Sequence, residues 1–175
     1  VAEAIEAALG ADALITALTG AGISKASGIP TFRGADGLWE SYRPEDVATK
    51  GVLERDPAAF WRFHDRLRAV IVEAVPNPAH FVLAEMEDCL TDVEFAVITQ
   101  NVDSLHQRAG SENVIELHGN ALSYTCMRCG DRPSHVDMPA EEYPPRCGRC
   151  DGVIRPDMVL FGEQLPADAI EKAMG

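Results

Sequence analysis

The chain lacks any hydrophobic run that approaches the roughly 20 residues a membrane-spanning helix needs. Its start also lacks the features of a signal peptide, because residues 1–9 alternate glutamate with small apolar residues, as an amphipathic helix would. Both absences predict a cytoplasmic protein with no membrane partner. In that reducing compartment, paired cysteines are expected to bind metal rather than to form disulfides.

Positive charge is also scarce. The 175 residues include 28 acidic and 15 basic side chains, which gives a formal net charge of -13. Only Lys25, Lys50 and Lys172 are lysines. Such a balance repels a phosphate backbone, so we expect no direct binding of nucleic acid. A surface rich in carboxylates, with arginine in place of lysine, is also typical of proteins in concentrated salt, and a halophilic source is a further prediction.

The remaining composition is that of an ordinary globular domain, with 46% hydrophobic and 25% charged residues. Helical patterns are expected to begin at Pro57, behind the N-cap Asp56, and at Pro78, behind the N-cap Asn77. Three short apolar runs predict buried strands: residues 13–18, 95–99 and 114–117. Strands that alternate with helices indicate an α/β fold with a Rossmann-like parallel sheet and helices on both faces.

Four of the five cysteines form a C-x2-C-x17-C-x2-C array: Cys126, Cys129, Cys147 and Cys150. This spacing predicts a tetrahedral zinc site, and four thiolates leave no open coordination position, so the metal is expected to be structural. Two disulfides, or iron in a rubredoxin-like site, are the alternatives. The fifth cysteine, Cys89, is expected to be a small packed side chain.

Polar or glycine residues follow each predicted strand. Gly20-Ala21-Gly22 follows the first strand, but Lys25 stands where the usual dinucleotide fingerprint has its third glycine, so a tight turn without a ligand is an alternative. The segment 100–103 follows the second strand, where Asp103 is either a ligand-binding carboxylate or the cap of a short helix.

His118 follows the third predicted strand. The ordinary pKa of imidazole, about 6.5, suits a general base near neutral pH. Because the carboxyl ends of parallel strands share one edge of a sheet, this ring is expected to lie beside the glycine turn and the 100–103 segment. The other histidines are expected to be structural: His64, His80, His106 and His135.

Several segments, in this order, together resemble the sirtuin family. They are Gly20–Ser24, Ser27–Gly34, Thr99–Asp103, Leu117–Gly119, the four cysteines and Met158–Glu163. Sirtuins are NAD-dependent protein lysine deacylases, with a Rossmann-like large domain and a small domain that carries a zinc ribbon and helices. The resemblance runs from about residue 13 to residue 163. It implies that the chain transfers the acetyl group of acetyl-lysine to ADP-ribose and releases nicotinamide, with NAD and zinc as cofactors.

The resemblance also implies roles for individual residues. His118 would be the general base, with Asn101 as a second catalytic residue. Phe32, Val159 and Phe161 would contact the substrate, whose peptide would bind as an added strand. The cofactor would be bound by Gly20, Ala21, Gly22, Ser24, Thr31, Phe32, Arg33, Trp39, Gln100, Asn101, Val102, Asp103 and His118.

The same resemblance implies a division of the chain into five segments. Residues 1–45 would form the first part of the large domain with its cofactor loop, 46–78 the helical part of the small domain, 79–120 the second part of the large domain, 121–153 the zinc-binding module, and 154–175 the return to the large domain. Family members continue beyond this point with strands that bind the adenosine half of NAD, so we expect this sequence to be truncated at its C-terminus and to be inactive by itself.

The acyl preference follows from one helix. Sirtuins that prefer acidic acyl groups carry a tyrosine and an arginine three positions apart there, and His64 and Leu67 occupy those positions here, so acetyl-lysine is expected. A shift of one residue in the alignment would bring Arg66 or Arg68 close to the acyl group. Two alternatives to deacetylation are mono-ADP-ribosyl transfer to protein and a non-catalytic, zinc-bearing fragment. A hydride-transferring dehydrogenase ranks last because the third loop glycine is missing.

Overall fold

The computed structural model describes residues 14–32, 37, 40, 42–90, 93–137, 140 and 142–175. The helix predicted over residues 1–9 lies outside them. None of the helices in this described part of the chain combines the length and apolar character that a bilayer span requires.

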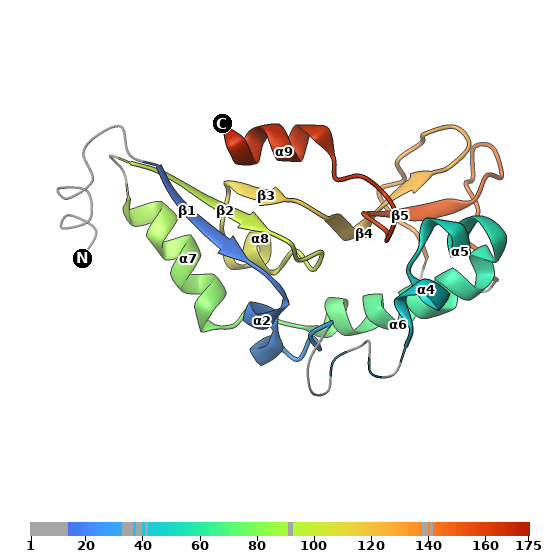
Figure 1. The fold of residues 1–175 in the computed structure, drawn as a ribbon, viewed down its shortest axis with the longest axis horizontal. Helices are drawn as coiled ribbons and strands as arrows, with labels where there is room; N and C mark the ends of the chain where they lie inside the picture. The colour runs from blue at the N-terminus through green and yellow to red at the C-terminus, as the bar shows by residue number, and fades with distance from the viewer. Residues whose placement is uncertain are drawn as a thin grey trace.

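A three-stranded parallel sheet forms one end of the molecule (Figure 1). Its strands are β1 (Leu14–Thr19), β2 (Glu94–Thr99) and β3 (Val114–Glu116), in the order β1-β2-β3. The register pairs Thr19 with Thr99 and Thr99 with Glu116, so all three strands end together. The strands lie where the apolar runs predict them, and their common end places residues 20, 100 and 117 at one edge.

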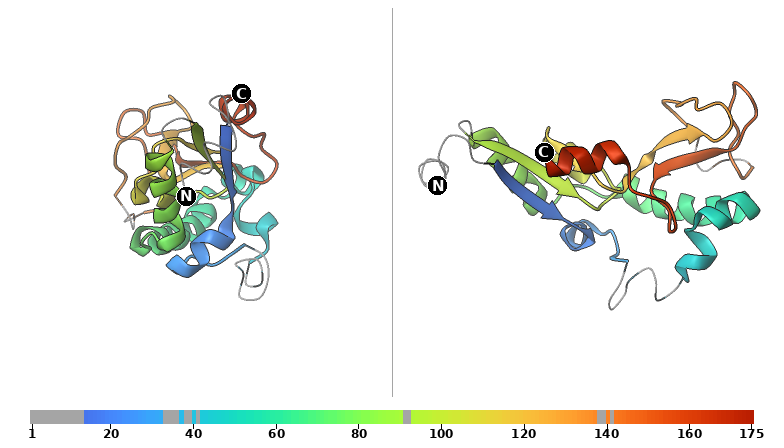
Figure 2. Two further views of the ribbon diagram at one scale, coloured as in Figure 1. Left: turned by 90° about the vertical axis from the view of Figure 1, so that its left-hand side faces the viewer. Right: turned by 45° about the horizontal axis from the view of Figure 1, so that its top comes forward.

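Helices cover the sheet on opposite sides, as Figure 2 shows. The helix α7 (Pro78–Cys89) packs against β2, and α9 (Ala167–Met174) packs against β3. The short helix α8 (Leu105–Ala109) connects β2 to β3 and packs against α7. The prediction of a Rossmann-like α/β fold with helices on both faces is therefore confirmed.

An antiparallel ribbon forms the other end of the molecule (Figure 1). Its strands are β4 (Gly119–Cys126) and β5 (Ile154–Met158), and the cysteine array lies between and beside them. Two smaller helices, α4 (Pro44–Val47) and α5 (Lys50–Arg55), pack near it. The ribbon and its helices enclose a separate apolar core that includes Val52, Phe60, Trp61 and Tyr124.

The long helix α6 (Pro57–Glu73) joins the two ends. Its first half belongs to the core of the ribbon, whereas Leu67 and Ile71 belong to a second core with α8 and β4. The predicted N-caps are confirmed: Asp56 Oδ1 accepts from the Ala59 amide at 2.9 Å, and Asn77 Oδ1 accepts from the Ala79 amide at 3.0 Å. Each cap satisfies an amide that the first helical turn leaves unpaired.

The turn after β1 continues into α2 (Ala21–Ser24) and the short 3-10 helix Lys25–Ser27, which ends at Gly28. The fifth cysteine, Cys89, is exposed at the end of α7, so the prediction that it is a small packed side chain was wrong.

Candidate active site

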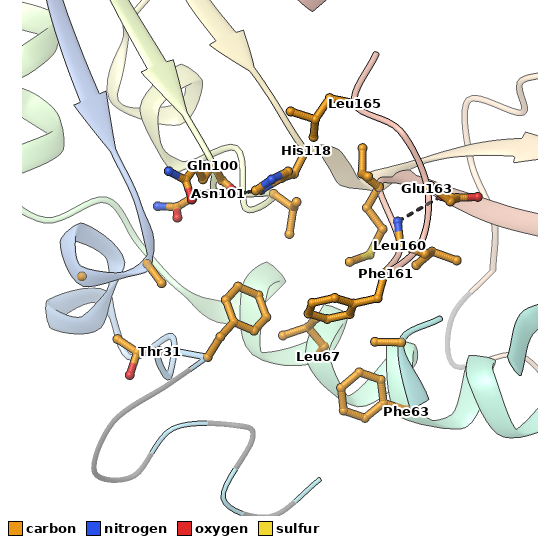
Figure 3. A pocket seen from close by; sticks show the side chains of 18 residues that line it. Thr31, Phe63, Leu67, Gln100, Asn101, His118, Leu160, Phe161, Glu163 and Leu165 are labelled. Carbon is orange, nitrogen blue, oxygen red and sulfur yellow. Dashed lines mark hydrogen bonds between the residues drawn. The ribbon is translucent and has the colours of Figure 1, made fainter. Parts of the chain in front are cut away.

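A cleft of about 620 Å³ opens between the carboxyl edge of the parallel sheet and the segment that follows β5 (Figure 3). The sheet side contributes the glycine turn, the end of β2 and His118. The opposite side contributes α6 and residues 158–163. The full lining is Ala21, Gly22, Thr31, Phe32, Ala48, Phe63, Leu67, Gln100, Asn101, Val102, His118, Met158, Val159, Leu160, Phe161, Gly162, Glu163 and Leu165.

Most residues that the sequence singled out meet in this one cleft. Those lining it are Ala21, Gly22, Thr31, Phe32, Gln100, Asn101, Val102, His118, Val159 and Phe161. Gly20, Ser24 and Asp103 lie behind the lining instead. Arg33 and Trp39 fall outside the described residues. The residues that line the cleft share this location because the turns after β1, β2 and β3 open at the same edge of the sheet.

The imidazole of His118 lies at the rim of the cleft and has one fixed partner (Figure 3). Its Nδ1 lies 2.9 Å from the carbonyl oxygen of Gln100. A carbonyl oxygen only accepts hydrogen bonds, so this contact requires the proton of the neutral ring to sit on Nδ1. The lone pair is then on Nε2, where it can accept a proton from a bound molecule.

A buried polar network supports the glycine turn from behind. Asn101 Nδ2 donates to the Gly20 carbonyl and to Ser24 Oγ, both at 3.1 Å, and Ser24 Oγ donates to Asp103 Oδ2 at 2.7 Å. The other carboxylate oxygen of Asp103 accepts from the Leu105 amide at 2.9 Å. Asp103, which precedes the N-cap Ser104, therefore accepts from the first amide of α8 with one oxygen and fixes the hydroxyl of Ser24 with the other. The network holds β2 and the glycine turn in a fixed relation.

Three histidines are buried, as expected of structural residues. His80 and His106 pack with ring centroids 4.9 Å apart, and His106 Nε2 lies 2.9 Å from Thr19 Oγ1. Burial lowers the pKa of both rings. His64 is 1% exposed between Phe60 and Trp61, and burial lowers its pKa to about 4. All three are neutral near pH 7. His135 is exposed and pairs with Asp137.

One side of the cleft is apolar. This side is lined by Phe63 and Leu67 of α6, which are one helical turn apart, and by Phe161 of the segment that follows β5. Of the two positions at which the sequence placed the acyl preference, Leu67 lines the cleft and His64 does not. Sequence reasoning missed Phe63, although its spacing of four residues from Leu67 was a usable signal.

The arginines nearby on α6 point elsewhere. Arg66 Nη1 donates to the Tyr42 hydroxyl at 3.2 Å, and Arg68 Nε donates to the Tyr124 hydroxyl at 3.0 Å. Neither belongs to the cleft lining, which within the described residues includes no lysine or arginine. A negatively charged acyl group would find no fixed cation there.

The four array cysteines converge at the far end of the molecule. Their sulfur atoms all lie within 4.8 Å of one another, with 3.5 Å between Cys126 and Cys150 and 3.8 Å between Cys129 and Cys147. A tetrahedron with zinc-sulfur bonds of about 2.3 Å has edges of about 3.8 Å, so the donor set fits zinc. Disulfide bonds of about 2.05 Å do not fit these separations. None of the four cysteines is among the described residues that line the cleft, which agrees with a structural metal.

The family model for the Sir2 family matches residues 20–175. The chain belongs to the Sir2 family. Two relatives show the extent of the likeness. The first is the NAD-dependent protein deacylase 1 of Caldanaerobacter subterraneus subsp. tengcongensis, which is 50% identical over 161 residues, or 92% of this chain. A NAD-dependent protein deacylase of Aquifex aeolicus is 50% identical over 159 residues, which are 91% of this chain.

Solved Sir2 structures share the fold. A Sir2 homologue in complex with ADP-ribose superposes with a TM-score of 0.84 at 43% identity and covers 92% of this chain. A Sir2 protein bound to a deacetylated peptide and 3'-O-acetyl ADP-ribose gives a TM-score of 0.78 at 41% identity and covers 93% of this chain. This Sir2 chain spans 66% of the length of each of the two relatives above and 64% of the ADP-ribose-bound structure, just under two thirds.

Proposed function

We propose that this chain contains the catalytic cleft of a NAD-dependent protein lysine deacetylase, which transfers the acetyl group of acetyl-lysine to ADP-ribose and releases nicotinamide. The observation that carries the proposal is the meeting of the imidazole of His118 with the amide side chains of Gln100 and Asn101 and with the turn at Ala21 and Gly22. The names of the relatives, all NAD-dependent protein deacylases, support the same reaction.

NAD supplies an electrophilic ribose carbon and a nicotinamide leaving group. We assign His118 Nε2 as the base that takes a proton from a ribose hydroxyl, because the Gln100 carbonyl fixes the tautomer that leaves this nitrogen free. The amides of Gln100 and Asn101 are suited to the ribose and carboxamide. Phe32 lines the cleft, where an aromatic ring can exclude water from the reacting atoms.

The rest of the cofactor set acts through the turn. Ala21, Gly22, Thr31 and Val102 line the cleft and are assigned to contact NAD, whereas Gly20, Ser24 and Asp103 are assigned to keep the turn in place. Small residues at the turn let a nucleotide approach the backbone closely. Arg33 and Trp39 remain predicted cofactor residues.

The peptide partner is proposed to bind beside residues 159–161. The Val159 amide donates to the His118 carbonyl at 2.8 Å, and the Phe161 amide donates to the Ala48 carbonyl at 3.1 Å, so this segment is fixed to both the sheet side and the helical side of the cleft. Val159 and Phe161 are two positions apart and both line the cleft, which is the spacing that strand addition by a peptide uses. The uncharged lining at Phe63 and Leu67 favours acetyl over an acidic acyl group.

The reaction is tested by incubating an acetylated peptide with the protein, including any further sequence that its gene encodes, with and without NAD. Mass spectrometry of the peptide is expected to show loss of acetyl only when NAD is present. ADP-ribose attached to protein without loss of acetyl would favour mono-ADP-ribosyl transfer. Absence of NAD binding by calorimetry, even at high salt, would favour a non-catalytic fragment.

The setting of the protein is part of the proposal. The charge of -13 supports a partner other than nucleic acid, and it also supports a cytoplasm of high salt. Unfolding curves in dilute and in concentrated salt test the second point. Equal free energy of unfolding in both would remove the reason to propose a halophilic source, and fractionation of the source cells tests the cytoplasmic location.

A further inference from the structure

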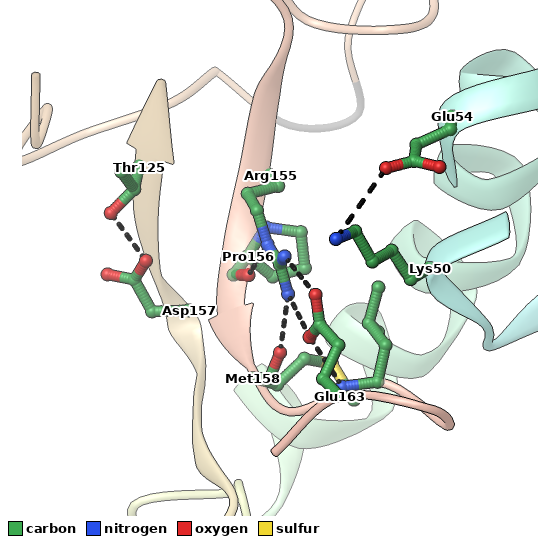
Figure 4. Close-up of polar contacts among 9 residues, drawn as sticks. Lys50, Glu54, Thr125, Arg155, Pro156, Asp157, Met158 and Glu163 are labelled. Carbon is green, nitrogen blue, oxygen red and sulfur yellow. Dashed lines mark hydrogen bonds and ion pairs between the residues drawn. The ribbon is translucent and has the colours of Figure 1, made fainter. Parts of the chain in front are cut away.

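Residues 158–163 form the wall of the cleft that faces the sheet, and three parts of the molecule hold them. The sheet side holds the Val159 amide through the His118 carbonyl, at 2.8 Å. The helical side holds the Phe161 amide through the Ala48 carbonyl, at 3.1 Å. The ribbon side holds the segment through an ion pair between Arg155 of β5 and Glu163 (Figure 4).

The ion pair is bidentate. Arg155 Nη1 donates to Glu163 Oε1 at 2.7 Å, and Arg155 Nη2 donates to Glu163 Oε2 at 2.8 Å. Two parallel charge-assisted hydrogen bonds fix direction as well as distance. The two side chains are only 21% and 19% exposed, so water screens them less than it would a surface pair.

Both members also bind the backbone of the segment. Arg155 Nη2 donates to the Met158 carbonyl at 2.8 Å, and Glu163 Oε2 accepts from the Leu160 amide at 3.0 Å. The Glu163 amide in turn donates to the Leu160 carbonyl at 3.0 Å. Glu163 therefore occupies both backbone polar groups of Leu160. These are the groups of the residue that separates Val159 from Phe161.

The consequence is a turn of fixed shape over residues 160–163. Glu163 engages both the amide and the carbonyl of Leu160, so neither group is available to a peptide. Leu160 lines the cleft together with Val159 and Phe161 on either side. The start of the segment does not depend on the ion pair. Gly119 pairs with Met158 across the ribbon, and Val159 bonds to His118.

We infer that the Arg155–Glu163 ion pair is a positioning device for peptide recognition: it fixes the turn over residues 160–163, and with it the places of Val159 and Phe161 in the part of the cleft where the peptide that flanks the acyl-lysine is proposed to bind. The inference rests on the proposed function, because it names which part of the substrate depends on the pair. The pair does not touch the reacting atoms. It positions the part of the cleft that is proposed to contact the peptide residues on either side of the modified lysine. Loss of the pair is expected to weaken binding of a peptide but not recognition of the acyl-lysine side chain.

The ion pair depends on the negative charge of the Glu163 carboxylate. The hydrogen bonds from Arg155 hold the pKa of the Glu163 carboxyl below its usual range, and Lys50 on the neighbouring helix adds to the effect. Lys50 is itself engaged with Glu54, at 3.8 Å. A neutral glutamine at position 163 would keep the size of the side chain but lose the bidentate pairing.

The test compares two substrates in four proteins: wild type, Glu163→Gln, Arg155→Gln and the double variant. One substrate is an acetyl-lysine peptide with several residues on each side, and the other is an acetyl-lysine derivative without flanking residues. If the recognition-competent shape of the segment falls to about a tenth of the population, the apparent Kd or KM for the peptide rises about tenfold. Turnover of the short derivative is expected to change less than about twofold.

The double variant is expected to be no worse than either single variant, since contacting residues act as one unit. Asp157→Asn is the matched control: it makes the same carboxylate-to-amide change as Glu163→Gln, on the strand that carries Arg155, but the Asp157 side chain accepts from Thr125 Oγ1 at 2.5 Å instead of pairing with Arg155 (Figure 4). Arg155→Lys, which keeps the charge, serves as a milder variant if the others unfold, and it is expected to fall between wild type and Arg155→Gln.

The outcomes separate this inference from the proposed function. Wild-type protein that removes no acetyl group from either substrate would overturn the proposed function, and the inference with it. Wild-type activity together with unchanged peptide KM in Glu163→Gln would overturn the inference alone. An equal loss on both substrates, with a lower melting temperature, would also overturn it, because it would show a general structural role.

Discussion

The Nδ1 atom of His118 lies 2.9 Å from the carbonyl oxygen of Gln100, a residue that follows a different strand of the same sheet. This contact requires the proton on Nδ1 and leaves Nε2 as the basic nitrogen. It connects the predicted base to the amide cluster of the cofactor side. Two strand ends that are 18 residues apart in the chain thereby form one chemical unit.

The first prediction concerns this base. His118→Ala is expected to lower deacetylation about a hundredfold or more, because a positioned general base contributes about that much. Zinc content and melting temperature are expected to stay close to wild type, since the ring lies at the rim of the cleft and outside the three apolar cores. His135→Ala, at an exposed position, is the control. Retained turnover in His118→Ala would remove the assignment.

A second prediction concerns the metal. Cys147→Ser is expected to lose zinc and to destabilise the ribbon, because Cys147 shares an apolar core with Trp61, whose Nε1 donates to the Ile154 carbonyl at 2.8 Å. Chelation of the wild-type metal is expected to shift the fluorescence of the buried Trp61 toward that of an exposed indole. Elemental analysis identifies the metal, and iron in place of zinc would contradict the prediction.

The control for the metal is the fifth cysteine. Cys89→Ser alters an exposed thiol on α7 and is expected to keep the full metal content. A loss of metal in this variant would mean that the array of four is not the complete ligand set.

A third prediction concerns the residue after His118. Gly119 has a φ of +67°, and a Cβ atom there would overlap the carbonyl oxygen of Asp157 on the paired strand. Gly119→Ala is therefore expected to destabilise the fold by about 2 kcal/mol or more. Gly51→Ala lies inside α5, where a Cβ meets only Thr49 Oγ1 at 3.9 Å, and is expected to stabilise the protein by up to about 1 kcal/mol. Denaturant unfolding of both variants measures the difference, and equal effects would contradict the prediction.

A fourth prediction concerns acid stability. Buried His64 stays neutral in the folded protein down to a pKa of about 4, whereas an unfolded histidine takes up a proton below about pH 6.5. Between these values the unfolded state binds more protons, so the free energy of unfolding falls as the pH falls from 6.5 to 4. The full contribution, on the order of 3 kcal/mol, is present above pH 6.5.

His64→Leu measures this contribution. The variant is expected to flatten the pH dependence of the free energy of unfolding between pH 6.5 and 4, whatever its absolute stability. Both proteins are compared at the same saturating zinc, so that loss of metal at low pH affects them alike. A slope equal to that of the wild type would show that His64 is protonated in the folded state.

The strand ends could be predicted from sequence because their geometry follows from the sheet. Once the runs ending at Thr99 and Glu116 are parallel strands, Asn101 and His118 must follow at the same edge. The cysteine spacing similarly restricts its four sulfurs to one metal. These features depend on local patterns, which a single sequence shows.

The opposite wall could not be predicted in the same way. Helical periodicity shows that Phe63 and Leu67 share a face with core residues, but not that this part of the face borders a cleft. The bidentate contact between Arg155 and Glu163 joins a residue of β5 to a residue of the irregular segment that follows it, where no period applies. The packing of Cys89 was misjudged for a related reason, since its buried neighbour Leu90 shows that this end of α7 packs on another face.

The account makes the cleft around His118 the place where NAD and acyl-lysine react together. The most direct test counts nicotinamide released against acetyl groups removed from a peptide at saturating NAD. The account predicts one nicotinamide for each acetyl group, and neither product when either substrate is omitted. Removal of acetyl without release of nicotinamide, or release of nicotinamide with the peptide unchanged, would contradict it.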